Sequence, residues 1–448
     1  MLSGVSGFVH RHRKKLLVTT GLVAGGYFLV DYVKSKFFEL QDRLATERAA
    51  KENLKRRFEQ NQQDATFTIM ALLPSLSGQV MERYPVEKIT QELQAKRGEK
   101  RAPAASVAAS DLPSETSINS SSVSAEHQPQ PQQNDDTATV AVQERQEGGE
   151  GTTKKTKTQL WKELKIESLT RAFTLIYTNA LLVFFTRLQL NILGRKNYVV
   201  SVIRLAEKRA SNQIAMEDLE GGSELAFEEE ELQINRMYLT FSWWLLNKGW
   251  VSLSERIQDA VVGVFDSINP RTDLSLAEFS DLIGKVQYRI DHRAGDDENN
   301  NFLNNLLPPS ELESYVLAQA PVTDANGVPV TLSSVEEGPL RKLLDETADF
   351  IESPNAVDVI HKLVHSGLSV FVSKVSSLYP TCGEEVTIPG RVKLASILAN
   401  VTRQTTTMTG GTPFDPNEYI RAMIDVPELD GFSALVYSNF DWSNLGLE

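Results

Sequence analysis

Two histidines have the spacing that most directly suggests chemistry. His361 and His365 stand four residues apart in HKLVH, so on a helix they would share one face and could bind zinc together. In zinc proteases with this spacing a glutamate after the first histidine acts as general base, but that position is Lys362, and no third ligand is evident. We therefore expect two ordinary helix histidines, with no metal ion and no cofactor.

Other catalytic motifs are absent from the sequence. It has no GxSxG turn for a nucleophilic serine, and GGTP at residues 410–413 lacks the lysine and the serine or threonine that complete a phosphate-binding loop. Cys382 is the single cysteine, in YPTCGEE, and has no nucleophile signature around it. A lone cysteine cannot form an internal disulfide, which is compatible with a reducing compartment. The sequence predicts that the protein is not an enzyme.

Trp161 is the best candidate for a protein-binding residue. It follows a long stretch without aromatic residues, at the start of an expected helix, and is flanked by Leu160, Leu164 and Lys157. Tryptophan is a preferred anchor of protein interfaces. The alternative is that an amphipathic helix uses this tryptophan in its own core. Trp243, Trp244 and Trp250 belong to a more apolar helix, and we expect them in the core.

The composition of the chain limits its possible partners and the size of its core. The chain has 448 residues, and 59 acidic residues against 46 lysines and arginines give a formal net charge of -13. This charge disfavours a nucleic-acid partner. Hydrophobic residues make up 41% of the chain, enough for one large core or two ordinary ones.

The N-terminus predicts a membrane anchor. A basic segment, residues 1–15, precedes an uncharged apolar stretch from Leu16 to Val30, and residues 16–33 are long enough for a spanning helix. The basic residues of the first segment are Arg11, Arg13, Lys14 and Lys15. A cleaved signal or an amphipathic surface segment is the alternative. No small-residue cleavage site follows and the chain lacks the cysteines of a secreted protein, which favours an uncleaved anchor.

The remainder reads as an all-α helical bundle with one long insertion. Residues 34–97 are expected to form the first cytosolic helices, including one from Ala65 that Pro74 ends. Residues 98–156 have no aromatic residue and are predicted to be a disordered insertion, and an acidic loop is expected over 211–230. Residues 157–448 continue the bundle. Their apolar spacing predicts helices at 231–250, 252–266, 274–290, 338–352, 355–379 and 391–408, and no clear strand pattern.

The segment from Ala172 to Phe185 is apolar on nearly every face. It could be a second membrane span, but only 15 residues separate Arg171 from Arg187, and they include polar Thr174, Thr178 and Asn179. A central helix buried by other helices fits this pattern better.

Several segments of the chain resemble a known family, that of the peroxisomal biogenesis factor peroxin three. The likeness rests on the basic and apolar N-terminus, on FEQNQQDATFTIMALLPSL at residues 58–76 and on LWKELKIESLTRAFTLIYTNALLVFFTRLQLNILG at residues 160–194. It is dense over residues 1–97 and 158–194 and looser, but collinear, to the C-terminus, where residues 343–360 match best. The insertion departs from shorter members and is similar to insertions of filamentous fungi.

The resemblance implies a function and a partner. Members are anchored in the peroxisomal membrane, with transit through the endoplasmic reticulum as one possible route, and contact its lipid through the anchor. Their elongated cytosolic bundle docks peroxin nineteen, the soluble receptor for newly made peroxisomal membrane proteins. The receptor's N-terminal amphipathic helix lies in an apolar groove at the membrane-distal end of the bundle. The residues that match this groove are Trp161 at its centre, Leu93 on its wall, Lys157 at its edge, and Thr90 and Asn191 at neighbouring positions.

Two alternatives stay open. The basic residues before the anchor outnumber Lys34 and Lys36 after it, so the positive-inside rule would leave the N-terminus in the cytosol. The family places it in the matrix, and we follow the family because the large folded part must reach cytosolic partners. The family also implies a second role, as a tether or adaptor that recruits inheritance or autophagy factors through a different face.

Overall fold

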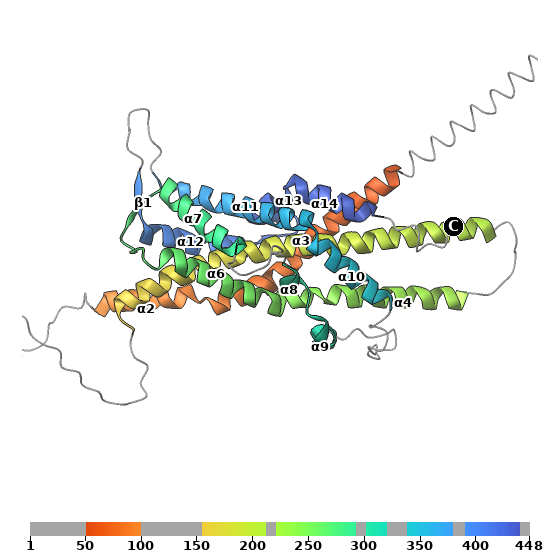
Figure 1. The fold of residues 1–448 in the computed structure, drawn as a ribbon, viewed down its shortest axis with the longest axis horizontal. Helices are drawn as coiled ribbons and strands as arrows, with labels where there is room; N and C mark the ends of the chain where they lie inside the picture. The colour runs from red at the N-terminus through yellow and green to blue at the C-terminus, as the bar shows by residue number, and fades with distance from the viewer. Residues whose placement is uncertain are drawn as a thin grey trace, which may run out of the picture. The chain divides into compact units, whose positions relative to one another are not determined.

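The structure is a computed structural model that describes residues 51–99, 155–211, 221–292, 302–319, 338–379 and 390–439, and most of them are helical (Figure 1). The chain divides into two compact units. Unit 1 comprises Met1–Pro85 and Lys165–Glu448, and unit 2 comprises Val86–Leu164. The predicted anchor and the residues of segment 1–15 lie outside the described residues, as do residues 100–154 of the insertion.

Helices account for nearly all elements in the described ranges. A first helix covers residues 51–83. The elements after it are α2 (Val86–Glu99), α3 (Lys157–Ser211), α4 (Gly221–Thr240), α5 (Ser242–Trp244), the π-helix η1 (Leu245–Gly249), α6 (Trp250–Phe265), β1 (Asp273–Ser275), α7 (Leu276–Asp291), α8 (Leu303–Leu306), the 3-10 helix η2 (Ser310–Leu312), α9 (Glu313–Gln319), α10 (Pro339–Glu352), α11 (Pro354–Ser376), β2 (Arg391–Lys393), α12 (Leu394–Met408), β3 (Gly411–Thr412), β4 (Asp415–Pro416), α13 (Glu418–Ile424) and α14 (Pro427–Ser438).

The long helix α3 supplies the centre of the core of unit 1. Every residue from 171 to 189 is buried, which confirms the prediction of a helix covered on all sides. Within the described ranges it is the one helix long and apolar enough to cross a membrane, yet its apolar window is fully buried in protein. Its aromatic side chains contact later helices: Phe173 lies 6.5 Å from Phe371 of α11, and Phe184 lies 5.3 Å from Phe432 of α14, between ring centroids.

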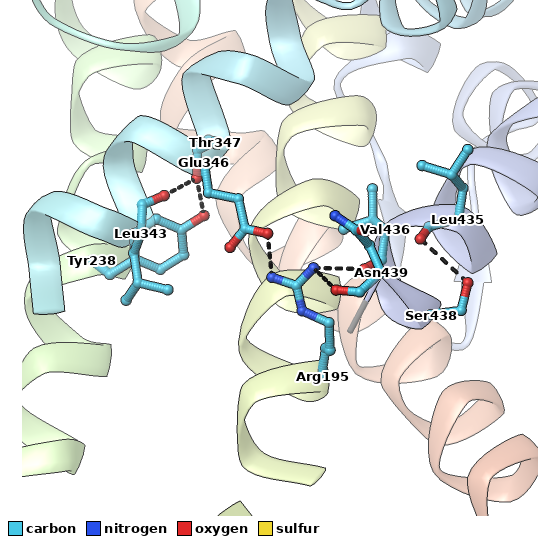
Figure 2. A network of polar contacts seen from close by, with 9 residues as sticks. All are labelled: Arg195, Tyr238, Leu343, Glu346, Thr347, Leu435, Val436, Ser438 and Asn439. Atoms are coloured by element: carbon cyan, nitrogen blue, oxygen red, sulfur yellow. Dashed lines mark hydrogen bonds and ion pairs between the residues drawn. The ribbon is translucent and has the colours of Figure 1, made fainter. Parts of the chain in front are cut away.

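Buried polar side chains of α3 bond to the ends of other helices. Arg195 is 8% exposed and donates from Nη1 to the carbonyl oxygens of Val436 (3.2 Å) and Asn439 (2.8 Å) at the C-terminal end of α14. Its Nη2 pairs with Glu346 of α10 (Figure 2). Since the last carbonyls of a helix lack intrahelical partners and favour a nearby cation, Arg195 satisfies α14, which has no basic residue in its own last turn.

Several helix starts follow local sequence signals. Ser275 and Glu278 form a capping box at the start of α7, with the Ser275 N–H 2.8 Å from Glu278 Oε2 and the Glu278 N–H 3.2 Å from Ser275 Oγ. Proline occupies the first positions of α10, α11 and α14, where its missing N–H costs nothing. The predicted helices at 252–266, 274–290, 338–352, 355–379 and 391–408 correspond to α6, α7, α10, α11 and α12 within a few residues.

The prediction that Pro74 ends a helix was wrong. Residues 51–83 are continuously helical through Pro74. The side chains on either side of it, Leu73, Leu76 and Val80, are all at most 1% exposed. Burial of this apolar stripe outweighs the cost of a proline inside a helix, about 3 kcal/mol.

The predicted acidic loop over 211–230 was wrong in part. Residues 212–220 lie outside the described residues, but α4 begins at Gly221 and takes in the glutamate run, since glutamate is a good helix former. Glu231 lies 3.7 Å from Lys196 Nζ and 3.6 Å from Arg204 Nη2, both on α3. Ion pairs with α3 therefore take up part of the acidic charge.

Two small antiparallel pairs of strands were not predicted. β1 pairs with β2, with Leu274 opposite Val392, and β3 pairs with β4 in a hairpin. Strands of two or three residues are too short to show an alternating pattern. The fold is thus mostly helical, with short strands at helix ends in the described part of the chain.

Candidate helix-docking site

Unit 2 is built around a small apolar cluster. Its members are Val86, Ile89 and Leu93 of α2 with Leu160 and Leu164 of α3, all between 0 and 8% exposed. The α2 members stand at i, i+3 and i+7 and the α3 members at i and i+4, so each set occupies one helix face. The two helices therefore pack through these faces.

Trp161 packs against this small apolar cluster without being enclosed by it. Its side chain is half-buried, whereas both neighbouring leucines of α3 are buried. The pattern predicts that one face of the indole is fixed by the cluster while the rest meets solvent. An indole held in this way can contact a partner without first having to be ordered.

The start of α3 is fixed by a reciprocal cap. The N–H of Thr156 lies 2.7 Å from Gln159 Oε1, and the N–H of Gln159 lies 3.2 Å from Thr156 Oγ1. This is a capping box of the form Thr-x-x-Gln, which satisfies two of the unpaired N–H groups of a helix start. The cap determines where Trp161 emerges on the first turns of α3.

The ends of α2 and α3 are also tied across the insertion. Lys96 donates from Nζ to the carbonyl oxygen of Lys155, and Lys155 Nζ lies 2.6 Å from Glu163 Oε1. The described residues before and after the insertion thus lie close together within unit 2, and the insertion does not have to separate the two helices.

Among the described side chains of unit 2, basic residues outnumber acidic ones although the whole chain is acidic, and we call these charged side chains its basic rim. The side chains described there are Lys88, Lys96, Lys155, Lys157 and Lys162 against Glu87, Glu92 and Glu163. Such a rim favours a partner that carries acidic residues beside its apolar ones.

Four of the five predicted groove residues lie in unit 2. Leu93 is 7% exposed and belongs to the small apolar cluster, and Trp161 packs against it. Thr90 is half-buried, and its Oγ1 donates to the carbonyl oxygen of Val86 at 2.9 Å. Lys157 is the exposed first residue of α3.

Asn191, the fifth predicted groove residue, is not part of unit 2. It lies in unit 1, 0% exposed, and its Oδ1 accepts from Asn61 Nδ2 (2.9 Å) and Gln62 Nε2 (2.7 Å) of the first helix. Asn191 is therefore a core residue of unit 1. The anchor residues Arg11, Arg13, Lys14, Lys15, Leu16 and Val30 lie outside the described residues.

Two contributors to the site were not singled out from the sequence. Val86 completes the α2 face, and Gln159 completes the cap of α3. The signals were present as the i, i+3, i+7 spacing in VEKITQEL and as Thr-x-x-Gln before an apolar run.

The histidine pair belongs to unit 1. His361 lies on α11 with Nε2 3.9 Å from Asp291 Oδ1, and His365 is exposed one turn later. Across the described ranges no group of three or more His, Cys, Asp or Glu side chains could hold a metal ion. Cys382 lies outside those ranges.

Comparison with known proteins gives a consistent result. The family model of Peroxin-3 matches residues 7–439. The peroxisomal biogenesis factor 3 of Yarrowia lipolytica is 48% identical, covering 97% of this chain and 99% of the relative. The peroxisomal membrane protein PEX3 of Komagataella phaffii is 33% identical (98% and 100% covered), and the peroxisomal biogenesis factor 3 of Rattus norvegicus is 23% identical (98% and 98% covered).

Proposed function

The chain belongs to the Peroxin-3 family and is a biogenesis factor of the peroxisomal membrane, and from this premise we propose that it docks the import receptor peroxin nineteen on unit 2. The observation that carries the proposal is Trp161, half-buried against the small apolar cluster of α2 and α3. An amphipathic helix binds in this mode when its apolar residues meet a preformed apolar surface. The basic rim suits acidic residues on the polar side of such a helix.

The proposal gives each groove residue a role. Trp161 is the central anchor and Leu93 belongs to the wall beneath it, while Lys157, exposed at the edge, makes polar contact with the bound helix. Thr90 bonds to its own helix backbone and shapes the wall without contacting the receptor through its hydroxyl. No group in this set performs chemistry, and receptor binding is its whole task.

A titration tests this proposal. Full-length protein in detergent is titrated with a synthetic peptide of the receptor's N-terminal amphipathic helix. We expect Trp161→Ala to weaken binding by about 2 kcal/mol, roughly 30-fold, with an unchanged melting temperature. Were Trp161 a core residue instead, the same variant would lose about 3–5 kcal/mol of folding stability.

A second tryptophan provides the control. Trp243 is also half-buried, but it lies in unit 1, with its ring centroid 5.8 Å from that of Tyr315. Trp243→Ala should leave the peptide affinity unchanged. Unchanged affinity in a well-folded Trp161→Ala protein would remove the docking site from this position.

The proposed topology is a single anchor at residues 16–33, with the N-terminus in the matrix and the bundle in the cytosol. The buried apolar window of α3 supports a single anchor, because it leaves no second candidate span among the described residues. Protease treatment of intact peroxisomes should degrade a C-terminal tag and spare an N-terminal one. A protected C-terminal tag would reverse the orientation.

A second role, as a tether for inheritance or autophagy adaptors, would use a surface of unit 1. Phe414, at the turn between β3 and β4, is 88% exposed, and its ring lies edge-on to Phe67, 42% exposed, at 5.2 Å between centroids. Aromatic residues are enriched at protein interfaces relative to the rest of the surface. Phe414→Ser should release such adaptors from peroxisomes without changing receptor binding, and retained adaptors would exclude this surface.

A further inference from the structure

A buried lysine closes the C-terminal end of α6. Lys165 is 2% exposed, and its Nζ donates to the carbonyl oxygens of Phe265 (2.6 Å), Asp266 (3.0 Å) and Ile268 (2.7 Å). An ammonium group has three N–H donors, so these bonds use all of them. α6 has no basic residue in its own last turn, and a cation at that end is favoured by the helix dipole.

The position of Lys165 in the chain matters as much as its bonds. It is the first residue of α3 that belongs to unit 1, since unit 2 ends at Leu164. Trp161 stands four residues earlier on the same continuous helix, so both side chains leave one face of α3, one turn apart. The lysine thus holds α3 to the end of α6 one turn after the docking tryptophan.

The chain passes from unit 1 into unit 2 between Pro85 and Val86, and the backbone before this point is also held by a buried cation. Arg171 is 0% exposed, and its Nη1 lies 3.3 Å from the carbonyl oxygen of Tyr84 while its Nη2 lies 3.0 Å from Thr405 Oγ1. α2 begins two residues after Tyr84, at Val86. Both helices of the small apolar cluster therefore continue from backbone that a buried cation of α3 fixes within unit 1.

We propose that Lys165 is a positioning residue for the receptor-docking site, with Arg171 as its counterpart on the α2 side; the inference rests on the docking function proposed above. Its three bonds hold the helix backbone directly after Leu164, and so keep the first two turns of α3, which contain Trp161, from fraying at their C-terminal side. Binding sites keep affinity when their contact residues are held by rigid, fully bonded support. Loosening this support lowers affinity without removing any contact residue.

The same helix offers a matched control. Arg195 is also a buried cation of α3 that bonds the last carbonyls of another helix, here Val436 and Asn439 at the end of α14 (Figure 2). It lies 30 residues beyond Lys165, about 45 Å along α3. Arg195→Met should lower stability as Lys165→Met does, but the bonds that it removes do not adjoin the residues of unit 2 in the chain.

The experiment uses full-length protein in detergent and the peptide probe described above. We expect Lys165→Met to weaken peptide binding by about fivefold to tenfold and to speed amide hydrogen exchange in residues 157–164. Lys165→Arg, which keeps the charge and the N–H donors, should restore both towards wild type. Arg195→Met should keep wild-type affinity and wild-type exchange in residues 157–164.

Each remaining outcome decides between the two proposals. Wild-type affinity and exchange in a folded Lys165→Met protein would overturn the positioning role, as would an equal loss of affinity in Arg195→Met. If Trp161→Ala binds normally, the docking proposal fails, and the exchange of residues 157–164 alone then shows whether Lys165 holds α3. Should Lys165→Met not fold, Lys165→Gln, which retains two N–H donors, takes its place with the same expected and contrary results.

Discussion

The hydroxyl groups of Tyr238 and Thr347 lie 2.6 Å apart in the core of unit 1 (Figure 2). Thr347 Oγ1 also donates to the carbonyl oxygen of Leu343, at 2.6 Å, one turn earlier on α10. A hydroxyl has a single proton, so Tyr238 must be the donor in the shared bond. The bond joins α4 to α10 through a tyrosine that is 0% exposed.

Because Tyr238 is the donor, substitutions of Tyr238 and of Thr347 should cost different amounts of folding free energy. Tyr238→Phe removes the donor and leaves Thr347 with its bond to Leu343, so we expect a loss of about 1 kcal/mol of folding free energy. Thr347→Val leaves a buried phenol without an acceptor and should cost more, about 1–3 kcal/mol. Thermal melts of both variants measure the order. A larger cost for Tyr238→Phe would mean that the donor is assigned wrongly.

The pH dependence of stability should change above pH 10. Burial raises the pKa of Tyr238, and burial together with Asp291 raises the pKa of Tyr177, above the ordinary value of about 10. The folded protein keeps these protons to higher pH than the unfolded chain does, so their contribution is constant below pH 10 and is lost as pH rises further. Tyr238→Phe lacks one such group. At pH 8 this variant should be about 1 kcal/mol less stable than wild type. The difference in folding free energy between the two proteins should shrink between pH 10 and 11, and a constant difference would contradict this.

Two glycines should respond to alanine in opposite directions. A Cβ at Gly249, in the π-helix η1, would lie 2.0 Å from the carbonyl oxygen of Asn305, and this backbone atom cannot yield like a side chain. Gly249→Ala should therefore cost about 1–3 kcal/mol through overpacking. Gly284, inside α7, has nothing within 4 Å of the new Cβ, so Gly284→Ala should gain about 0.5–1 kcal/mol. Thermal melts compare the two, and equal effects would refute the packing argument.

Deleting residues 1–33 should release a folded, soluble helical protein. The other apolar stretch long enough to span a bilayer within the described residues, on α3, is buried in protein. Carbonate extraction of cell membranes is the measurement, with the full-length chain as the control that stays in the pellet. Retention of the truncated chain would mean that α3 contacts lipid.

Deleting residues 102–150 should leave both stability and peptide affinity close to wild type. The deleted segment has no aromatic residue to bury. Because Lys96 reaches the carbonyl of Lys155, the ends of α2 and α3 lie close enough for the few remaining residues to join them. A melting curve and a peptide titration check the two expectations, and loss of cooperative unfolding would assign the insertion a structural role.

The sequence predicted helices wherever an apolar stripe was regular, and it erred where tertiary packing decided. The apolar pattern of residues 172–185 fits both a membrane span and a buried helix, and the flanking Arg171 and Arg187 favoured the buried helix. Pro74 has a strong local preference to end a helix, and only the burial of its neighbours overrides it. Local signals contain no information about that burial.

For the site, the sequence and the family resemblance together predicted Trp161 and Leu93, which the structure brings to one cluster. Asn191 was grouped with them because it belongs to the same matching segment, but its side chain is buried in unit 1 and bonds to Asn61 and Gln62 of the first helix. The support from Lys165 and Arg171 could not be predicted, since their partners are backbone carbonyls 87 to 103 residues away and, for Arg171, also the hydroxyl of Thr405, 234 residues away.

The central position of α3 has a consequence for synthesis on the ribosome. Its apolar window is covered in part by segments made much later: Phe432 packs on Phe184, and the carbonyl of Met408 accepts from Asn179 Nδ2 at 3.3 Å. At about 5–20 residues per second, roughly 10–50 s pass between the two regions. During that interval a nascent segment with the length and composition of a membrane span lacks part of its cover. We therefore expect the growing chain to need factors that shield apolar segments until α14 emerges.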